Sequence, residues 1–220
     1  KSSLKMSEIK NNSVDYLITD PPYGDTIQYS ELSFIWNCWL EKDFDIEKEV
    51  IINPVQNKGV TEYYNQLVSF IGEAKRVLKK DAYFTLAFHN KDLKIWISLA
   101  ELIRDHGMEL VDISAFDTFG SPYNKNWAKF SPKSDFYVTF INRNKKVAPP
   151  TSKKVYPHQI ASEITKYLGK NNGKLFNLNK AYDVFVGVVI SKIFDGSQVA
   201  EHERLSIENI TSLFRESAPP

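Results

Sequence analysis

The spacing of apolar residues predicts a strand at the start of the chain, followed directly by a helix. Residues Val14 to Thr19 are mostly β-branched, aromatic or aliphatic, and the run stops at Asp20, where two prolines follow. Proline lacks an amide hydrogen and cannot continue a hydrogen-bonded ladder, so the strand ends there. Between Glu31 and Leu40 the apolar positions recur every three or four residues, which predicts a buried helix.

Further along the chain, strand-like and helix-like patterns alternate, which is typical of an α/β fold. Mixed composition predicts an exposed loop over 41–59 and an irregular segment over 117–134. The regular elements predicted between these segments are a helix over 63–78, a strand over 82–88, a helix over 93–103 and strands over 108–116 and 135–141.

The end of the chain differs in composition from the rest. Residues 143–155 are rich in lysine and arginine and contain a proline pair, which predicts a linker. Beyond it, helical periodicity appears over 160–168, 178–193 and 207–214. The sequence therefore predicts an α/β unit over 1–142, a linker over 143–155 and a small helical domain over 156–220.

Charge and cysteine content narrow the function classes. The 220 residues include 28 basic and 27 acidic side chains, a net charge of +1, so a nucleic-acid site must be a local patch. The single cysteine, Cys38, excludes an internal disulfide framework and a cysteine-based zinc ribbon, and we expect it to be a buried core thiol. No apolar run is long enough for a membrane span, and a cytoplasmic protein is expected. His106, His158 and His202 show no metal-ligand spacing, so no metal is predicted.

The segment Asp20-Pro21-Pro22-Tyr23 carries the candidate chemistry. It follows a predicted central strand at its carboxyl end, where ligands bind in open α/β sheets. A simple turn with a solvent-facing tyrosine is the alternative.

These residue types suit reactions at a planar amine. The lone pair of an exocyclic base amine is delocalised into the ring, and two hydrogen-bond acceptors can localise it. The Asp20 carboxylate and the Pro21 carbonyl supply two acceptors, and the proline rings of Pro21 and Pro22 hold them in place. Tyr23 supplies a flat face on which an extruded base can stack. No covalent intermediate is needed.

The tetrapeptide resembles the Asp/Asn/Ser-Pro-Pro-aromatic motif of the DNA amino-methyltransferases, which methylate N6 of adenine or N4 of cytosine. The resemblance covers about 13–142 and is greatest to microbial adenine-specific methylases. It includes Asp25, Tyr29 and Glu31-Leu32-Ser33, then Arg76-Val77-Leu78-Lys79 and Phe88-His89-Asn90-Lys91-Asp92.

The resemblance implies S-adenosylmethionine as cofactor and DNA as partner. It assigns catalysis to Asp20, Pro21, Pro22 and Tyr23, with Asp20 and Pro22 also contacting the cofactor. Two further sets have structural alternatives. The cluster at 89–92 is equally a helix cap, and the segment from Phe116 to Lys133, in which aromatic residues and lysines are interleaved, is equally an ordered surface loop. The substrate-contacting residues expected from the motif and both sets are Tyr23, Asp25, Tyr29, His89, Asn90, Lys91, Tyr123, Lys125, Trp127 and Lys129.

The glycine-rich turn that such enzymes use for the cofactor is not recognisable in this sequence. The nine glycines are scattered, and none forms a cluster behind a predicted strand. We therefore expect a partial Rossmann-like methyltransferase sheet, the carboxyl half of such an enzyme, followed by a small helical unit and inactive by itself. The upstream half is expected either before Lys1 or on another polypeptide.

Alternative functions remain open at this point. Related tetrapeptides serve RNA bases and protein amides, and a non-catalytic nucleic-acid-binding fragment is also compatible. If the upstream strands are absent, the strand over 14–19 lies at a sheet edge, which predicts self-association or capture of a foreign segment. Alternatively, the helical tail covers this strand or forms a dimer contact through Phe185, Val188, Val189 and Ile193.

Overall fold

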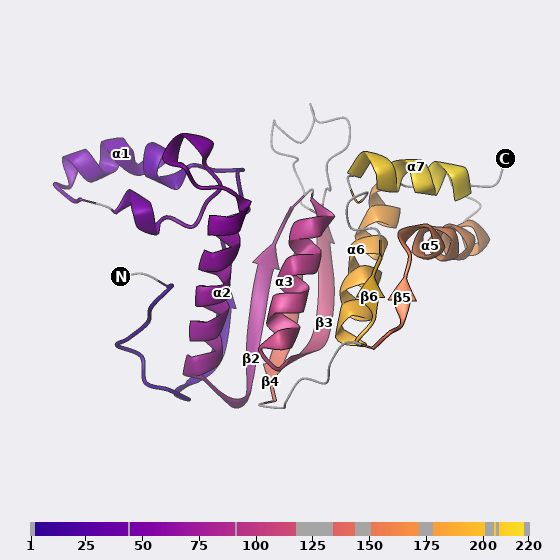
Figure 1. Ribbon diagram of the computed structural model, residues 1–220, viewed down its shortest axis with the longest axis horizontal. Helices are drawn as coiled ribbons and strands as arrows, with labels where there is room; N and C mark the ends of the chain where they lie inside the picture. Colours follow the sequence, from indigo (N-terminus) through magenta and orange to yellow (C-terminus); the bar gives the residue numbers. More distant parts are fainter. Residues whose placement is uncertain are drawn as a thin grey trace.

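A computed structural model shows a mixed α/β fold (Figure 1). It describes residues 3–43, 45–90, 92–117, 134–143, 151–171, 178–200, 205 and 207–217. The helices are α1 (Tyr29–Trp39), α2 (Val60–Val77), α3 (Leu93–Asp105), α5 (Pro157–Asn171), α6 (Leu178–Phe194) and α7 (Ile207–Ser217). The strands are β1 (Val14–Thr19), β2 (Leu78–Phe88), β3 (Met108–Asp117), β4 (Ser134–Asn142), β5 (Lys154–Val155) and β6 (Gln198–Val199).

The main sheet has the strand order β1-β2-β4-β3. Strand β1 pairs with β2 in parallel, whereas β4 runs antiparallel to both β2 and β3. All four strands were predicted, and β1 begins and ends at the predicted residues. Among the described strands β1 has a neighbour on one side only, which is the edge position expected for it if the upstream strands are absent.

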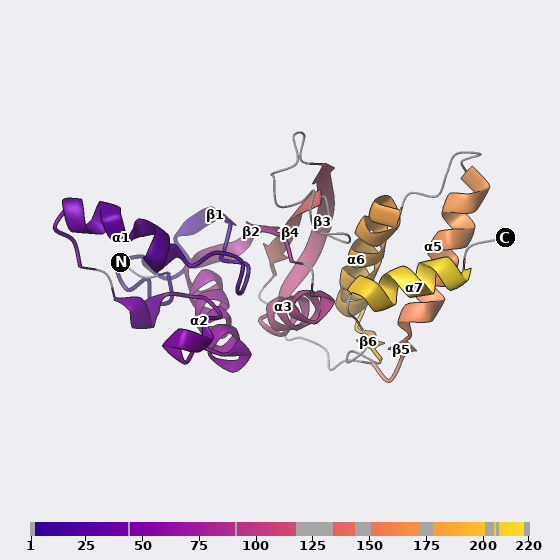
Figure 2. The same ribbon diagram turned by 90° about the horizontal axis from the view of Figure 1, so that it is seen from above.

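One face of this sheet is covered by helices. Figure 2 shows α2 and α3 on the same side of the strands. Alternate residues of the strands point to this side: Phe84 and Phe140 are stacked with ring centroids 5.9 Å apart, and both are at most 2% exposed. Trp96 of α3 packs edge-on against Phe88 and Phe136. This aromatic layer is the centre of the hydrophobic core.

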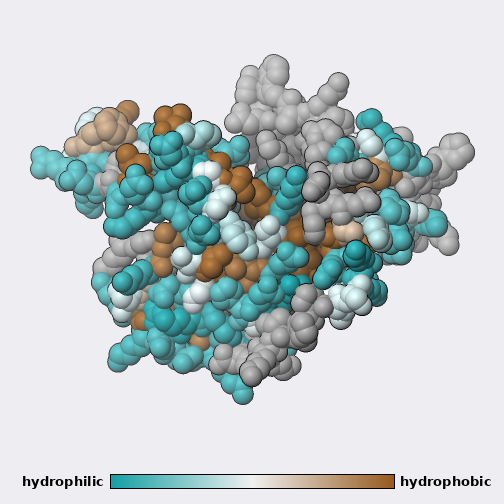
Figure 3. All heavy atoms as spheres, viewed as in Figure 1, coloured by the Kyte–Doolittle hydropathy of each residue, from teal (hydrophilic) through white to brown (hydrophobic). Residues whose placement is uncertain are grey.

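The prediction of a buried α1 is wrong. The helix forms, but Leu32 is 70% exposed and Trp39 76% exposed, and Cys38 is exposed as well, so it is not the core thiol expected from sequence. Figure 3 shows hydrophobic side chains at the surface over the region of α1. Periodic apolar spacing aligns side chains on a helix but does not supply the surface that buries them.

The loop predicted over 41–59 is more ordered and more buried than expected. It contains two short 3-10 helices, Ile46–Lys48 and Pro54–Gln56. Ile51 is fully buried, and Lys58 is only 5% exposed because its ammonium group donates to the carbonyls of Ile46 and Glu49. A cation buried in this way must be hydrogen-bonded, and here the backbone supplies the acceptors.

The helical segments at the end of the chain pack on the far edge of the sheet. Helix α6 lies against α3 and β3, at the edge of the sheet opposite to β1 (Figure 1). Phe185, Val189 and Ile193 are fully buried in the same hydrophobic cluster as α3. The alternative in which this tail covers β1 is therefore wrong. Phe185, Val189 and Ile193 are buried within the chain and so are not available for the expected dimer contact, whereas Val188 is only partly buried. The proposed division into units at 142 and 156 stays a prediction.

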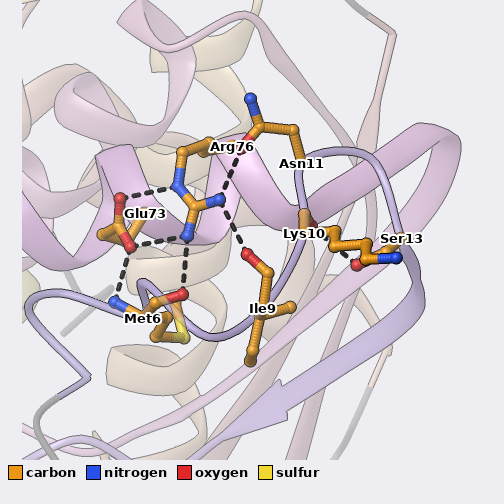
Figure 4. Close-up of polar contacts among 7 residues, drawn as sticks. All are labelled: Met6, Ile9, Lys10, Asn11, Ser13, Glu73 and Arg76. Atoms are coloured by element: carbon orange, nitrogen blue, oxygen red, sulfur yellow. Dashed lines mark hydrogen bonds and ion pairs between the residues drawn. The ribbon is translucent and has the colours of Figure 1, made fainter.

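The segment that leads into β1 is tied to α2 by one ion pair (Figure 4). The Arg76 guanidinium contacts the Glu73 carboxylate at 2.8 Å and donates to the carbonyls of Met6 and Ile9 at 2.8 and 2.9 Å. Glu73 in turn accepts from the Met6 amide at 2.6 Å. These bonds fix the start of β1 against α2 and thereby help to place the residues that follow β1.

Candidate active site

The predicted tetrapeptide lies at the carboxyl end of β1, next to the carboxyl end of β2. Because β1 and β2 are parallel, Asp20 follows β1 at the same edge of the sheet where His89 and Asn90 follow β2. This is the edge at which open α/β sheets bind ligands. The sequence-based placement of these two groups at one edge is confirmed.

Three consecutive carbonyl groups of this segment accept hydrogen bonds from other parts of the protein. The Tyr63 hydroxyl donates to the Pro22 carbonyl at 2.7 Å, and the Asn90 amide nitrogen donates to the Tyr23 carbonyl at 3.3 Å. The backbone amide of Ile52 donates to the Gly24 carbonyl at 3.1 Å. The Pro21 carbonyl takes part in none of these three bonds. The segment is therefore anchored on one side by α2, the 45–58 loop and the β2–α3 connection.

Gly24 permits the sharp turn after the tetrapeptide. Its φ is +76°, a conformation that side chains with a Cβ rarely adopt, and an added Cβ would lie 3.4 Å from the Cδ1 atom of Ile52. The turn directs the chain away from the sheet toward α1, while Asp20 stays exposed at the surface.

Tyr23 lies between the sheet edge and the Asp20 carboxylate. Its hydroxyl donates to Asp20 Oδ1, and its ring packs edge-on against Phe88 with centroids 5.3 Å apart. Burial and, next, the hydrogen bond to Asp20 raise the pKa of Tyr23 well above its usual value. The hydroxyl therefore remains a donor at any physiological pH.

The other predicted site residues lie in different environments. Asp25 is exposed, and Tyr29 is 43% exposed, with its pKa raised by burial and then by the charges of Asp20 and Glu49. His89 is half-buried, and its Nδ1 atom lies 3.0 Å from the Ser134 carbonyl.

Asn90 is only 8% exposed, so its side chain lies inside the structure rather than on a substrate-facing surface. Its Oδ1 atom accepts from the Asp92 amide at 2.8 Å, and Asp92 caps α3 by accepting from the Lys94 amide. The helix-cap interpretation of this cluster is therefore correct for Asp92, while Asn90 links the cap to the tetrapeptide.

Some predicted contacts cannot be placed. Lys91 and the loop residues Tyr123, Lys125, Trp127 and Lys129 lie outside the described residues. Their assignment to substrate binding stays a prediction.

Sequence reasoning missed Tyr63 and Ile52 as parts of the site. Tyr63 was counted only as an apolar position of its helix, and it is indeed 2% exposed. Its hydroxyl has a specific acceptor 41 residues away in the chain, and no local pattern reveals such a contact. The short distance to the Pro22 carbonyl is the signal that identifies it.

The described ranges hold neither a cluster of metal ligands nor a helix that could span a membrane. They contain no group of three histidine, cysteine, aspartate or glutamate side chains placed to hold a metal ion. None of the helices in this part of the chain has the length and hydropathy needed to cross a bilayer.

Comparison with solved structures finds DNA methylases at low similarity. TTHA0409 of Thermus thermophilus, assigned as a DNA modification methylase, is 10% identical with a TM-score of 0.40, over 97% of this chain and 93% of that one. Its complex with S-adenosyl-L-methionine gives 12% identity and a TM-score of 0.37, over 94% and 91% of the two chains. The cytosine-N4-specific PvuII DNA methyltransferase is 14% identical with a TM-score of 0.41, over 99% and 90%. At these values the likenesses carry no argument about this chain.

The family assignment comes from a family model. None of the curated proteins matches the chain. The model described as DNA methylase, which covers N6- and N4-methyltransferases, matches residues 14–211 and so includes the tetrapeptide, the whole main sheet and most of the helical tail. The chain belongs to the N6/N4 DNA methylase family.

Proposed function

We propose that this protein transfers a methyl group from S-adenosylmethionine to N6 of adenine in DNA. The observation that carries the proposal is the anchored tetrapeptide, in which an exposed Asp20 carboxylate stands beside the Tyr23 ring at the carboxyl edge of the sheet. The family supports transfer to an exocyclic amine. The choice of adenine follows from the resemblance of residues 13–142 to adenine-specific methylases.

In this mechanism Asp20 and the Pro21 carbonyl each accept one hydrogen of the amine. The two acceptors draw the nitrogen lone pair out of conjugation and direct it toward the methyl group. On gaining the methyl group the amine must lose one proton, and Asp20 would be the group that takes it. The fixed φ of both prolines spares the site the cost of ordering these acceptors when the base arrives.

Tyr23 has a double role in the proposal. The base that leaves the duplex stacks on its ring, which contributes about 1–3 kcal/mol toward the cost of unstacking. Its hydroxyl occupies one oxygen of Asp20 in the structure described above, and the incoming amine replaces that hydroxyl. Asp25, Tyr29 and His89, at the same edge, are the described candidates for further contacts to DNA.

Bound S-adenosylmethionine supplies the activated methyl group. The residues present fit only the reacting end of this cofactor, where Asp20 and Pro22 flank the amine. The scattered glycines offer no glycine-rich turn that would let the backbone approach its nucleoside end closely. We therefore propose that a further α/β unit holds the nucleoside end, and that the isolated chain binds the cofactor weakly. Calorimetry showing micromolar binding to residues 1–220 would contradict this.

The proposed activity is tested by expressing the full-length gene product, with the proposed cofactor-binding unit included, in a host without its own DNA amine methylation. Nucleosides from digested DNA are then separated by mass spectrometry, and N6-methyldeoxyadenosine is the expected product. N4-methyldeoxycytidine would change the base, and methylation confined to RNA or to protein amides would change the substrate. No methylation in any polymer would favour a non-catalytic nucleic-acid-binding role.

The Asp20→Ala variant tests the catalytic assignment. Removing one preorganised group of this kind lowers the transfer rate by about a hundredfold or more, whereas phosphate contacts preserve DNA affinity. Asp15→Ala is the matched control, because Asp15 lies on β1, the strand that leads to Asp20, and pairs with Lys79 at the surface. Equal losses of rate and affinity in Asp20→Ala would contradict the assigned role.

A further inference from the structure

We infer that Tyr63 and Asn90 are positioning residues that hold the Pro21 carbonyl in the orientation needed to accept a hydrogen from the substrate amine. The inference rests on the proposed function, because it concerns the acceptor pair that this function uses. Neither residue touches the amine in this arrangement. Both act through the backbone of the tetrapeptide.

The argument starts at the Pro22 carbonyl. The pyrrolidine ring fixes φ of Pro22, so the remaining rotation within this residue is about its Cα–C bond. The hydrogen bond from the Tyr63 hydroxyl, 2.7 Å long, restrains that rotation. The Pro21 carbonyl lies in the peptide plane that joins Pro21 to Pro22, so with Pro22 held by its ring and by this hydrogen bond, that plane turns only if Pro21 itself moves.

Tyr63 is well suited to this task. Its ring is 2% exposed within the core, so the hydroxyl can move little relative to α2. Burial raises its pKa to about 12, so the hydroxyl keeps its proton and remains a donor across the physiological range. The hydrogen bond couples the rigid core directly to the reactive turn.

Asn90 restrains the next carbonyl group along the chain, that of Tyr23. Its amide nitrogen donates to the Tyr23 carbonyl at 3.3 Å, while its own backbone carbonyl accepts from the Trp96 indole at 3.1 Å. Its Oδ1 atom is held by the Asp92 amide. Trp96 and Asp92 therefore hold Asn90 in place, and Asn90 in turn holds the Tyr23 carbonyl. A precisely built site requires such support from the residues behind it.

Two matched tyrosines allow a clean test. Tyr63→Phe removes only the hydroxyl and keeps the buried ring, whereas Tyr64→Phe makes the same change at the neighbouring residue, which is 37% exposed. In the protein assayed together with the proposed cofactor-binding unit, we expect kcat of Tyr63→Phe to fall about tenfold or more with KM for DNA nearly unchanged, because a misplaced acceptor affects the reacting amine and not the phosphate contacts. Tyr64→Phe should match the unmodified protein in both constants.

Asn90→Asp supplies a second variant. Aspartate keeps the oxygen that accepts from the Asp92 amide but has no hydrogen to donate to the Tyr23 carbonyl. The same split, a lower kcat at nearly constant KM, is expected. A higher KM for DNA without a fall in kcat would overturn the inference.

A measurement independent of activity separates this inference from the proposed function. Amide hydrogen exchange followed by NMR should show the Ile52 amide, which donates to the Gly24 carbonyl of this turn, exchanging about tenfold faster in Tyr63→Phe, since a hydrogen bond that orders the turn has been removed. If exchange is unchanged, or if exchange is faster but kcat is not lowered, the positioning role is wrong. If the unmodified protein transfers no methyl group even with the proposed cofactor-binding unit present, the proposed function fails while the exchange result still decides whether Tyr63 orders the turn.

Discussion

The two faces of the main sheet differ sharply although they are built from alternate residues of the same strands. On the face covered by α2 and α3, Phe84 is fully buried, whereas its neighbour Tyr83, pointing the other way, is 44% exposed. The outer face continues with large side chains, each between 39% and 60% exposed: Tyr16, Ile18, Tyr137 and Phe116. One face thus packs into the hydrophobic core, and the other presents large apolar side chains to solvent.

This difference in burial between the two faces is unusual for the parallel pair of strands, β1 and β2. Parallel strands are normally covered on both sides, and the β1–β2 pair carries apolar residues on both faces in the manner of a covered pair. The outer side chains also form a polar chain, in which the Tyr16 hydroxyl donates to Thr85 at 2.8 Å and Thr85 lies 2.9 Å from Thr139. The covered face therefore supplies the hydrophobic core, whereas the outer face leaves large apolar side chains in contact with solvent.

Helices α1 and α2 show the same contrast. The buried stripe of α2 faces the sheet, whereas α1 exposes Leu32, Trp36 and Trp39 by 62–76%. Helix α1 has Glu31 in its first turn and no basic residue in its last turn, so its surface has little to attract a phosphate backbone or an anionic membrane. The tetrapeptide contacts α2 through the bond from Tyr63 to the Pro22 carbonyl, and it leads along the chain into α1.

The largest expected effect comes from breaking the covered face. Phe84→Ala removes a ring that packs between Phe70 and Phe140 and should cost about 3–5 kcal/mol in the free energy of unfolding. Tyr83→Ala, on the outer face, should cost only about 1 kcal/mol or less. Urea denaturation measures both, and equal losses would show that the outer face is as well packed as the inner one.

A second experiment addresses the exposed edge. We expect the isolated chain to self-associate along β1, and Ile18→Lys, which places a charge on that edge, should shift it toward monomer in light scattering. Val55→Lys introduces the same charge at a 91% exposed position away from the sheet and should leave association unchanged. A monomer for all three proteins would refute self-association.

The smallest expected effect concerns the anchor of β1. Hydrogen bonds from Arg76, and then from the Met6 amide, lower the pKa of Glu73 from its usual 4.5 to about 2. The stabilisation is therefore fully present above pH 4.5 and is lost as the pH falls toward about 2. Glu73→Gln should remove this part of the pH dependence of the urea midpoint. A midpoint that falls with acid equally in both proteins would show that other carboxylates dominate.

Local chemistry determined the elements and the reactive turn. The β-branched run and the two prolines set both ends of β1, and periodic apolar residues placed α2 and α3 within a few positions of their observed bounds. The tetrapeptide was recognisable because its rigidity and its acceptors belong to the residues themselves. These properties act over a few neighbouring residues, which is the range that sequence patterns report.

Only the tertiary structure decided which of these surfaces are covered and which distant groups meet. The spacing of Leu32, Ile35 and Trp39 puts them on one helix, but whether they are buried depends on contacts made elsewhere in the fold. Lys58 looked like an exposed loop residue and is buried, because carbonyl groups from a nearby turn converge on it. Tyr63 looked like one more core position, and its hydroxyl anchors the Pro22 carbonyl. Burial and hydrogen-bond partners are set by packing between segments far apart in the chain, so local patterns do not contain them.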